Sequence, residues 1–256
     1  MTGLEMGFVL VAGVCAGGIN AVVGSGSLIT FPVLLATGMP PVTATVSNAL
    51  GVIPGSLTGA LGYREELRGQ RGRLVRLGAG AVCGGVTGAT LLLALPATAF
   101  ERIVPVLVGL ALVLVVLQPR LSRAVRRRRE ATGREDAGRG DGGPLLYAGL
   151  TLASVYGGYF AAAQGILYVA LMGMLLDDSM QRLNAAKNVL VALVNTVAAL
   201  FFLFAAEFDW TAVGLLALGS TLGGHLGARV GRRLPPTVLR GLIVVVGTVA
   251  LVHLVA

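Results

Sequence analysis

Long apolar runs separated by short polar segments fill this chain, and they predict its structural elements. Each run is continuous instead of alternating between apolar and polar positions, which favours helices over the strands of a transmembrane barrel. Five runs precede a polar stretch at residues 118–143, and five follow it. The runs cover residues 4–23, 28–39, 42–61, 74–95 and 103–117, and then 145–163, 166–176, 183–206, 212–228 and 238–255.

Composition places these helices in a membrane. Hydrophobic residues make up 55% and charged residues 12% of the 256 residues, whereas roughly a quarter of a soluble domain is charged. The 38 glycines favour close helix packing through small residues. The net charge of +8 comes from arginines in the loops, where they set orientation and meet membrane lipid. No nucleic-acid partner is expected.

The two halves of the chain repeat one unit. The matched positions keep the same order throughout both halves, which predicts a duplication. Residues 1–118 form the first membrane repeat, residues 119–143 an arginine-rich linker, and residues 144–256 the second repeat. A shift of about 140 positions lays Gly17-Gly18 on Gly157-Gly158 and Ser47-Asn48 on Lys187-Asn188, and a shift of about 139 lays Gly80, Gly84 and Gly88 on Gly219, Gly223 and Gly227.

Arginines predict that the second repeat is inverted relative to the first. Short loops rich in basic residues stay in the cytoplasm. The loop at residues 64–76 carries five arginines and the linker carries more, so we place both in the cytoplasm of a multi-pass plasma-membrane protein. The loop equivalent to residues 64–76 in the second half, residues 205–210, has no basic residue, and we therefore place it outside.

The second run of each half is too short to cross a bilayer. Residues 28–39 and 166–176 give twelve and eleven positions, against roughly 20 for a spanning helix. A re-entrant helical hairpin or two short tilted helices would both fit the topology. Pro32, Pro54 and Pro105 lie inside runs, and we expect each to kink or interrupt its helix.

The predicted fold is thus an all-helical polytopic membrane protein with two inverted-topology repeats. Each repeat has a broken or re-entrant helical hairpin followed by three spanning helices. In total we expect about eight full spans plus short half-helices.

Lys187 is the main candidate for chemistry. It is the only lysine in the chain and lies in a long apolar run, whereas none of the twelve acids lies in the interior of such a run and Glu5 is next to the end of one. An unpaired charge at membrane depth indicates a functional site, so a bound anion is the candidate counter-ion. The alternative is that the lysine extends to the cytoplasmic interface.

The tips of the two short runs are the second candidate. Half-helices at equivalent positions offer free N–H groups and positive dipole ends to an anion. Asn48 and Asn188 are repeat mates from which an amide can face the tips, or else only cap exposed backbone. Ser47 is a second-rank candidate, and Tyr159 can line a pocket or serve as a membrane anchor. The tip residues are Ser25, Gly26 and Ser27 in the first half and Gln164 and Gly165 in the second.

Catalytic and metal sites have little support in this sequence. The acids lie in loops and the two histidines, His225 and His253, are isolated, so neither a metal cluster nor a Ser-His-acid arrangement is predicted. We expect no enzymatic activity and no cofactor.

Two segments carry a resemblance to a known family. GGINAVVGSGSLITFPVLLATGMPPVTATVSNALG (residues 17–51) and YGGYFAAAQGILYVALMGMLLDDSMQRLNAAKNVLVALVN (residues 156–195) resemble the TauE/SafE sulfite exporter family of membrane permeases. Its glycine-rich turn followed by proline matches Gly24–Gly26 and Pro32, and its downstream asparagine matches Asn48. The resemblance covers nearly the whole chain.

The resemblance implies a transporter, with export as the expected direction, of small sulfur-containing anions such as sulfite, sulfoacetate or other organosulfonates. Together with the residues above, it predicts alternating access at a midplane site. The alternatives are an anion channel, a carrier for another small anion such as a carboxylate, and a membrane scaffold without transport activity. The glycine ridges leave room for a homo-oligomer.

The inverted orientation can be tested by labelling. Single cysteines placed at Arg68 and at Glu207, in a background without Cys15 and Cys83, should react with an impermeant maleimide from opposite sides of the membrane. Reaction of both from one side would disprove the inversion.

Overall fold

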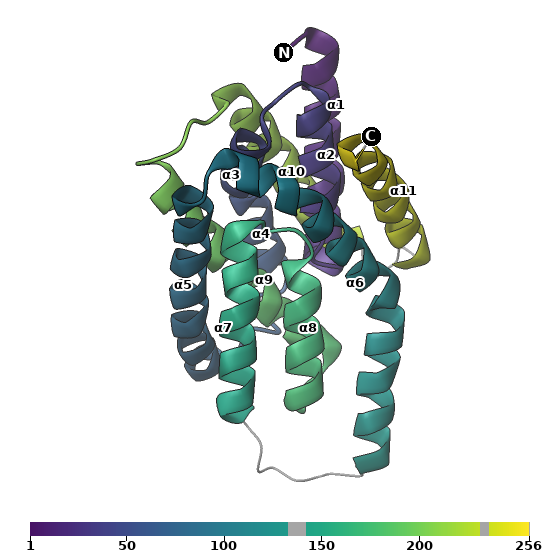
Figure 1. Ribbon diagram of the computed structural model, residues 1–256. Helices are drawn as coiled ribbons and strands as arrows, with labels where there is room; N and C mark the ends of the chain where they lie inside the picture. The colour runs from purple at the N-terminus through teal and green to yellow at the C-terminus, as the bar shows by residue number, and fades with distance from the viewer. Residues whose placement is uncertain (133–141, 231–235, 256) are drawn as a thin grey trace.

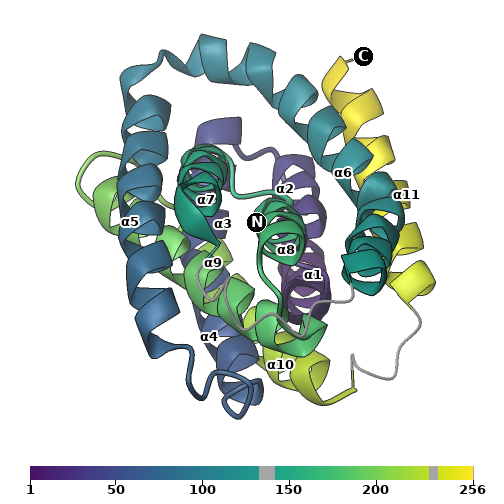
Figure 2. The ribbon, with the colours of Figure 1, turned by 90° about the horizontal axis from the view of Figure 1, so that it is seen from below.

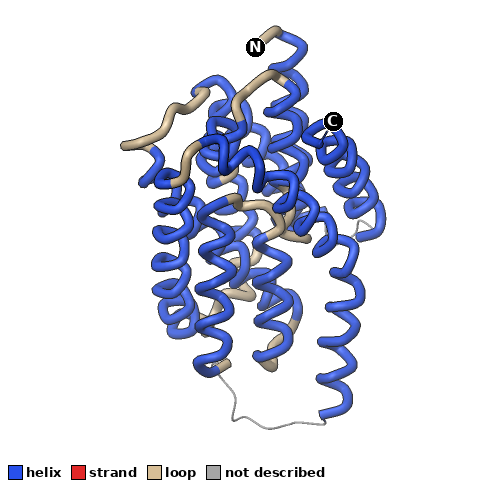
Figure 3. The backbone as a smooth tube through the Cα atoms, viewed as in Figure 1, coloured by secondary structure: helices blue, strands red, loops and turns tan. Residues whose placement is uncertain are grey.

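The computed structural model describes residues 1–132, 142–230 and 236–255, and in these residues the chain forms helices and turns without a strand (Figure 3). The prediction of an all-helical fold is confirmed for this part of the chain. The helices are α1 (Gly3–Val22), α2 (Ser27–Ala36), α3 (Pro41–Gly51), α4 (Ile53–Gly62), α5 (Arg71–Ala94), α6 (Ala97–Thr132), α7 (Gly143–Tyr159), α8 (Gln164–Leu175), α9 (Met180–Phe202), α10 (Trp210–Val230) and α11 (Pro236–Val255).

The helices form a bundle with two distinct ends. Both chain termini lie at one end, which is uppermost in Figure 1 and which we call the terminal end. The last turns of α6, the start of α7 and the turn at residues 63–70 lie at the opposite end, which we call the arginine end. Seen along the bundle in Figure 2, α5, α6, α11 and α10 surround α1, α2, α7 and α8.

Four described helices are long and apolar enough to cross a membrane. They are α1, α5, residues Ala97–Arg120 of α6, and α9. Helices α2 and α8 have 10 and 12 residues, which is less than the roughly 20 that a crossing needs. The two short apolar runs are therefore short helices, and the total of about eight full spans stays a prediction.

Each short helix completes a hairpin. Helix α1 runs inward from the terminal end, and α2 leads back to α3 near the same end (Figure 1). Helix α7 runs inward from the arginine end, and α8 returns toward it. The two hairpins thus enter the bundle from opposite ends, and the re-entry of either short helix into the membrane stays a prediction.

Prolines explain a difference between the halves. The apolar run at residues 42–61 divides into α3 and α4 at Val52, and Pro54 occupies the first turn of α4. Proline lacks the N–H that a continuous helix needs, but it fits a first turn. Pro32 and Pro105 lie within α2 and α6, which continue through them. Helix α9 has no proline and is unbroken.

Helix boundaries follow the spacing of the predicted repeat. Helix α7 begins at Gly143, 140 residues after Gly3 of α1, and α10 begins at Trp210, 139 residues after Arg71 of α5. The α3–α4 pair occupies the place that α9 has in the second half. The packing shows the same correspondence between the halves. Helix α1 lies along α10, and its counterpart α7 lies along α5, the counterpart of α10.

Glycines bring these pairs of helices into backbone contact. A Cβ atom at Gly223 of α10 would lie 2.8 Å from the carbonyl carbon of Val14 and 2.9 Å from the backbone nitrogen of Gly18, both in α1. At Gly88 of α5, a Cβ would lie 2.7 Å from the backbone nitrogen of Tyr159. Such distances leave no room for a side chain, so these ridges serve packing.

A single methyl group should therefore separate α1 from α10. Gly223→Ala should destabilise the protein by about 1–3 kcal/mol, the usual cost of overpacking. Gly214→Ala is the matched control, because a Cβ at this exposed position of the same helix meets no atom within 4 Å. Thermal unfolding in detergent measures both, and equal melting temperatures for the two variants would contradict the packing argument.

Candidate functional site

The two hairpin tips meet at the centre of the bundle. The backbone N–H of Gly165, at the start of α8, donates a hydrogen bond to the carbonyl oxygen of Gly24 at 3.1 Å. Gly24 has φ +87°, and the second tip turns through Ala161 at φ 64° and Ala163 at φ 58°. Left-handed backbone is unusual for alanine and costs on the order of 1–3 kcal/mol. Packing around the second tip therefore maintains this unfavourable backbone conformation.

Only glycine fits at this crossing. A Cβ on Gly24 would lie 2.7 Å from the Cα of Gly165, and a Cβ on Gly165 would lie 2.6 Å from the Cα of Gly24. The same two Cβ atoms would lie 3.2 and 3.0 Å, respectively, from the Cδ of Lys187. The lysine side chain therefore crosses the contact between the tips.

The ammonium of Lys187 binds the end of α1. This residue is fully buried, and its Nζ donates to the carbonyl oxygens of Asn20 at 2.8 Å and Ala21 at 3.4 Å. The last carbonyls of a helix lack partners within the helix and carry the negative end of its dipole. The amide of Asn188 also donates to Ala21, at 3.3 Å. A cation at this helix end is therefore favourably placed.

Lys187 has no anionic partner in the described part of the chain. Asp178 there pairs with Arg73 at 2.6 Å and with Arg182 at 2.7 Å, and neither ion pair involves the buried lysine. The side chain lies against the tips and does not extend to the interface. The carbonyls of α1 thus satisfy its hydrogen bonds without neutralising its charge.

The first tip is capped by a residue that the sequence pattern did not single out. The side-chain Oδ1 of Asn20 accepts from the backbone N–H of Gly26 at 3.1 Å. Asn48 of α3 is buried, and its Oδ1 accepts from the hydroxyl of Thr30 in α2 at 2.5 Å. Asn48 thus faces α2, one turn into the half-helix, while its repeat mate Asn188 faces α1. An asparagine directly before the glycine-rich turn was the available signal for Asn20.

The second tip is held by a chain of side-chain hydrogen bonds. Gln164 Nε2 donates to the hydroxyl of Tyr168 at 2.6 Å. That hydroxyl lies 2.6 Å from Ser154 Oγ, which donates to the carbonyl of Leu150 at 2.6 Å. The series fixes the α8 end of the tip to α7. Tyr168 lies one turn into α8, and no local sequence pattern indicates its link to Ser154 in α7.

Several buried polar atoms in the described residues have no hydrogen-bond partner. Such atoms are rare, because leaving one unpaired costs free energy, and each calls for an explanation. Two of them belong to the tips, which makes them the natural contacts for a bound polar ligand. They include Ser25 Oγ and Gln164 Oε1 at the tips, together with Tyr156 OH, Tyr159 OH and Asn195 Oδ1.

Two predicted residues contact elements other than the tips. Ser47 Oγ accepts from the backbone N–H of Asp209 at 3.1 Å, just before α10, although its repeat mate is Lys187. Tyr159 packs its ring against Phe100 of α6, with centroids 5.5 Å apart. Ser27 is buried as the first residue of α2.

The tips offer fewer free N–H donors than the sequence indicated. Gly165 N–H is bonded to Gly24 and Gly26 N–H to Asn20. The cause is that two glycine-containing tips approach closely enough to bond to each other. In this conformation these two N–H groups are already bonded, and the unpartnered side-chain atoms of the tips are Ser25 Oγ and Gln164 Oε1.

Polar contacts join different helices at each end of the bundle. At the arginine end, Asp178 bridges Arg73 of α5 and Arg182 of α9. Gln70 Nε2, beside them, donates to the carbonyl of Arg182 at 3.0 Å. Near the other end, the Ser47–Asp209 contact joins α3 to the start of α10. Between these contacts the buried lysine is enclosed.

The tip contact can be tested with one methyl group. Gly165→Ala should force the tips apart, so amide hydrogen exchange in residues 22–28 should rise by at least about tenfold, equivalent to roughly 1.4 kcal/mol. Gly7→Ala is the control, since a Cβ there meets nothing within 4 Å. Unchanged protection in the Gly165 variant would show that the contact is not required.

Comparisons with known proteins identify the family of this chain. The family model described as Sulfite exporter TauE/SafE matches residues 9–254. The chain is 26% identical to the probable membrane transporter protein YfcA of Escherichia coli K12, covering 96% of this chain and 88% of that one. It is 25% identical to a probable membrane transporter protein of Haemophilus influenzae, covering 91% and 88%. No solved structure matches significantly. This multi-pass membrane protein belongs to the TauE/SafE sulfite exporter family.

Proposed function

We propose that this protein is a transporter of small sulfur-containing anions, such as sulfite, sulfoacetate or another organosulfonate, with its binding site where the two hairpin tips meet. The observation that carries the proposal is the fully buried ammonium of Lys187, whose hydrogen bonds in the described part of the chain go to neutral carbonyls. The family membership and the names of the relatives support the transport part.

Electrostatics explains why the ligand is an anion. A buried charge in a medium of low dielectric constant is expensive unless an opposite charge neutralises it. Carbonyl dipoles at the end of α1 offset part of this cost. A bound anion supplies the missing opposite charge, which makes this position favourable for an anion and unfavourable for a cation.

The neighbouring groups suit an oxyanion. Sulfite and sulfonates carry several oxygen acceptors, and a site for them needs several donors. Lys187 and Asn188 contribute N–H donors from α9, and Ser25 contributes a hydroxyl that has no partner in the described structure. Gln164, whose Oε1 is also unpartnered, becomes a further donor when its amide rotates and gives up the hydrogen bond from Nε2 to Tyr168.

Alternating access follows from the arrangement of the hairpins. Corresponding helix boundaries and packing partners support two repeats of inverted topology. In this proposal the arginine end faces the cytoplasm of the plasma membrane. The Asp178 cluster then closes the cytoplasmic side and the Ser47–Asp209 contact closes the other side. Opening either side exposes the tips to one compartment at a time.

Uptake into liposomes tests the site and the substrate together. Purified wild type should take up sulfite or sulfoacetate saturably, and counterflow should separate a carrier from a channel. Lys187→Met, which keeps the length of the side chain but removes its charge, should lower uptake by at least about tenfold, or roughly 1.4 kcal/mol. Lys187→Arg should retain more activity than Lys187→Met, because it keeps the charge.

Two comparisons make the result decisive. Arg102→Gln removes a positive charge from an exposed position at the start of α6 and should leave uptake unchanged. Sulfate and acetate show whether the site prefers sulfur oxyanions over other anions. Equal uptake by wild type and Lys187→Met would reject the site, whereas lysine-dependent uptake of acetate alone would reject the substrate class.

A further inference from the structure

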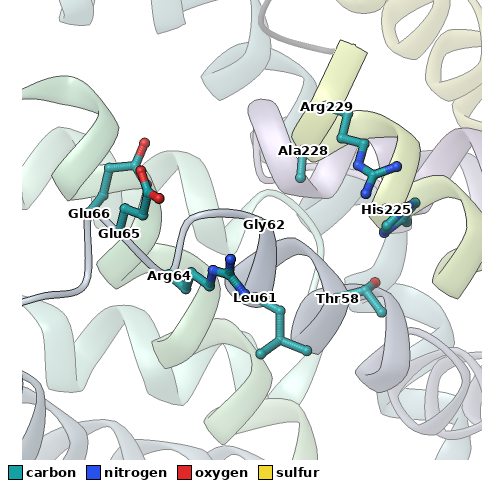
Figure 4. Close-up of a pocket in the computed structure, with 9 residues that line it drawn as sticks. All are labelled: Thr58, Leu61, Gly62, Arg64, Glu65, Glu66, His225, Ala228 and Arg229. Atoms are coloured by element: carbon teal, nitrogen blue, oxygen red, sulfur yellow. The ribbon is translucent and has the colours of Figure 1, made fainter.

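A cleft of about 470 Å³ opens at the arginine end, between the last turn of α4 and the last turns of α10. It lies apart from the hairpin tips and takes no part in the proposed transport site. Figure 4 shows the side chains that line it. Its charged or titratable residues are Arg64, Glu65 and Glu66 from the turn after α4, and His225 and Arg229 from α10.

The charges in this cleft are segregated. Arg229 and His225 extend from α10 on one side, and the carboxylates of Glu65 and Glu66 lie together on the other, with Arg64 between them (Figure 4). Within the described part of the chain, the ion pairs involve neither Arg64 nor Arg229. Both arginines are exposed. The cleft thus presents the guanidinium groups of Arg64 and Arg229 and the carboxylate of Glu65 to a ligand.

An exposed leucine surface adjoins the cleft. Leu57 and Leu61 lie one turn apart on α4 and are 50% and 67% exposed. Leu222 and Leu226 lie one turn apart on α10 and are 58% and 53% exposed. Both helices end at the cleft, so these leucines lie farther from the arginine end than the charged residues do. In a membrane protein such side chains face lipid chains.

We propose that the cleft binds the headgroup of an aminophospholipid, phosphatidylethanolamine. The phosphate binds Arg64 and Arg229, because guanidinium matches phosphate geometry. The ammonium, a donor of three hydrogen bonds, binds on the carboxylate side of the cleft, at Glu65. The acyl chains lie along the four leucines.

Charge complementarity selects this lipid over two others. The negatively charged headgroup of phosphatidylglycerol satisfies the arginines but brings no cation to the carboxylate of Glu65. Phosphatidylcholine has a cation, but its quaternary ammonium has no N–H to donate to a carboxylate. Only a zwitterion with a primary ammonium engages both sides of the cleft, while its acyl chains engage the leucines.

Native mass spectrometry of the purified protein, delipidated and then supplied with equal amounts of the three phospholipids, tests this proposal. Wild type should retain phosphatidylethanolamine at least about tenfold better than phosphatidylglycerol. Arg229→Gln should lower that retention by about tenfold. Glu65→Gln should shift the preference toward phosphatidylglycerol. Arg102→Gln, exposed at the start of α6 and outside the cleft, should change neither value.

The ratio of retained lipids does not depend on transport activity, so this test and the uptake test fail independently. Equal retention of phosphatidylethanolamine and phosphatidylglycerol by wild type would overturn the proposal. An unchanged ratio of these two lipids in Glu65→Gln would also overturn it. A competition with soluble glycerophosphoethanolamine distinguishes the source of the headgroup. Displacement of the lipid by equimolar soluble headgroup would show that the leucines contribute nothing and would overturn the assignment to a phospholipid.

Discussion

The contact of two glycines at the centre of the bundle is the constraint on which the interior depends. Because Gly24 and Gly165 have no side chains, two helix hairpins from opposite ends can meet backbone to backbone. This meeting sets the depth at which α2 and α8 begin. It also defines the narrow space that the stem of Lys187 crosses. A larger residue at either position would move both hairpins and the lysine together.

The lysine depends on that contact for its hydrogen-bond partners. Placing one lysine at the centre of a membrane helix costs about 2.5–3.5 kcal/mol on insertion scales, and the hydrogen bonds to Asn20 and Ala21 offset part of this cost. The offset is possible because α1 stops at the tip and leaves its last carbonyls free. An unbroken spanning helix in that place would have bonded those carbonyls internally. The broken helix is therefore what makes a buried cation tolerable.

Local features of the sequence predicted most of the helices, although α6 extends to Thr132 through part of the predicted linker, while contacts between distant segments could not be predicted. The short apolar runs predicted α2 and α8, which begin at Ser27 after a glycine-rich turn and at Gln164 after an alanine-rich turn. The burial of Lys187 followed from its lone place in an apolar run. In contrast, the Gly24–Gly165 bond joins residues in different halves, and no local pattern specifies such a distance. Ser47 shows the limit of repeat reasoning, since its repeat mate Lys187 has different neighbours.

The partners of Lys187 are main-chain oxygen atoms, and this has a consequence for how α1 tolerates change. Replacing the side chain of Asn20 removes its hydrogen bond to Gly26 but leaves its carbonyl oxygen in place, so the hydrogen bond from Lys187 can persist through side-chain changes in the last turn of α1. An alanine scan of α1 would not detect it. Replacing a backbone amide in the last turn by an ester, which weakens the carbonyl as an acceptor, would reveal it.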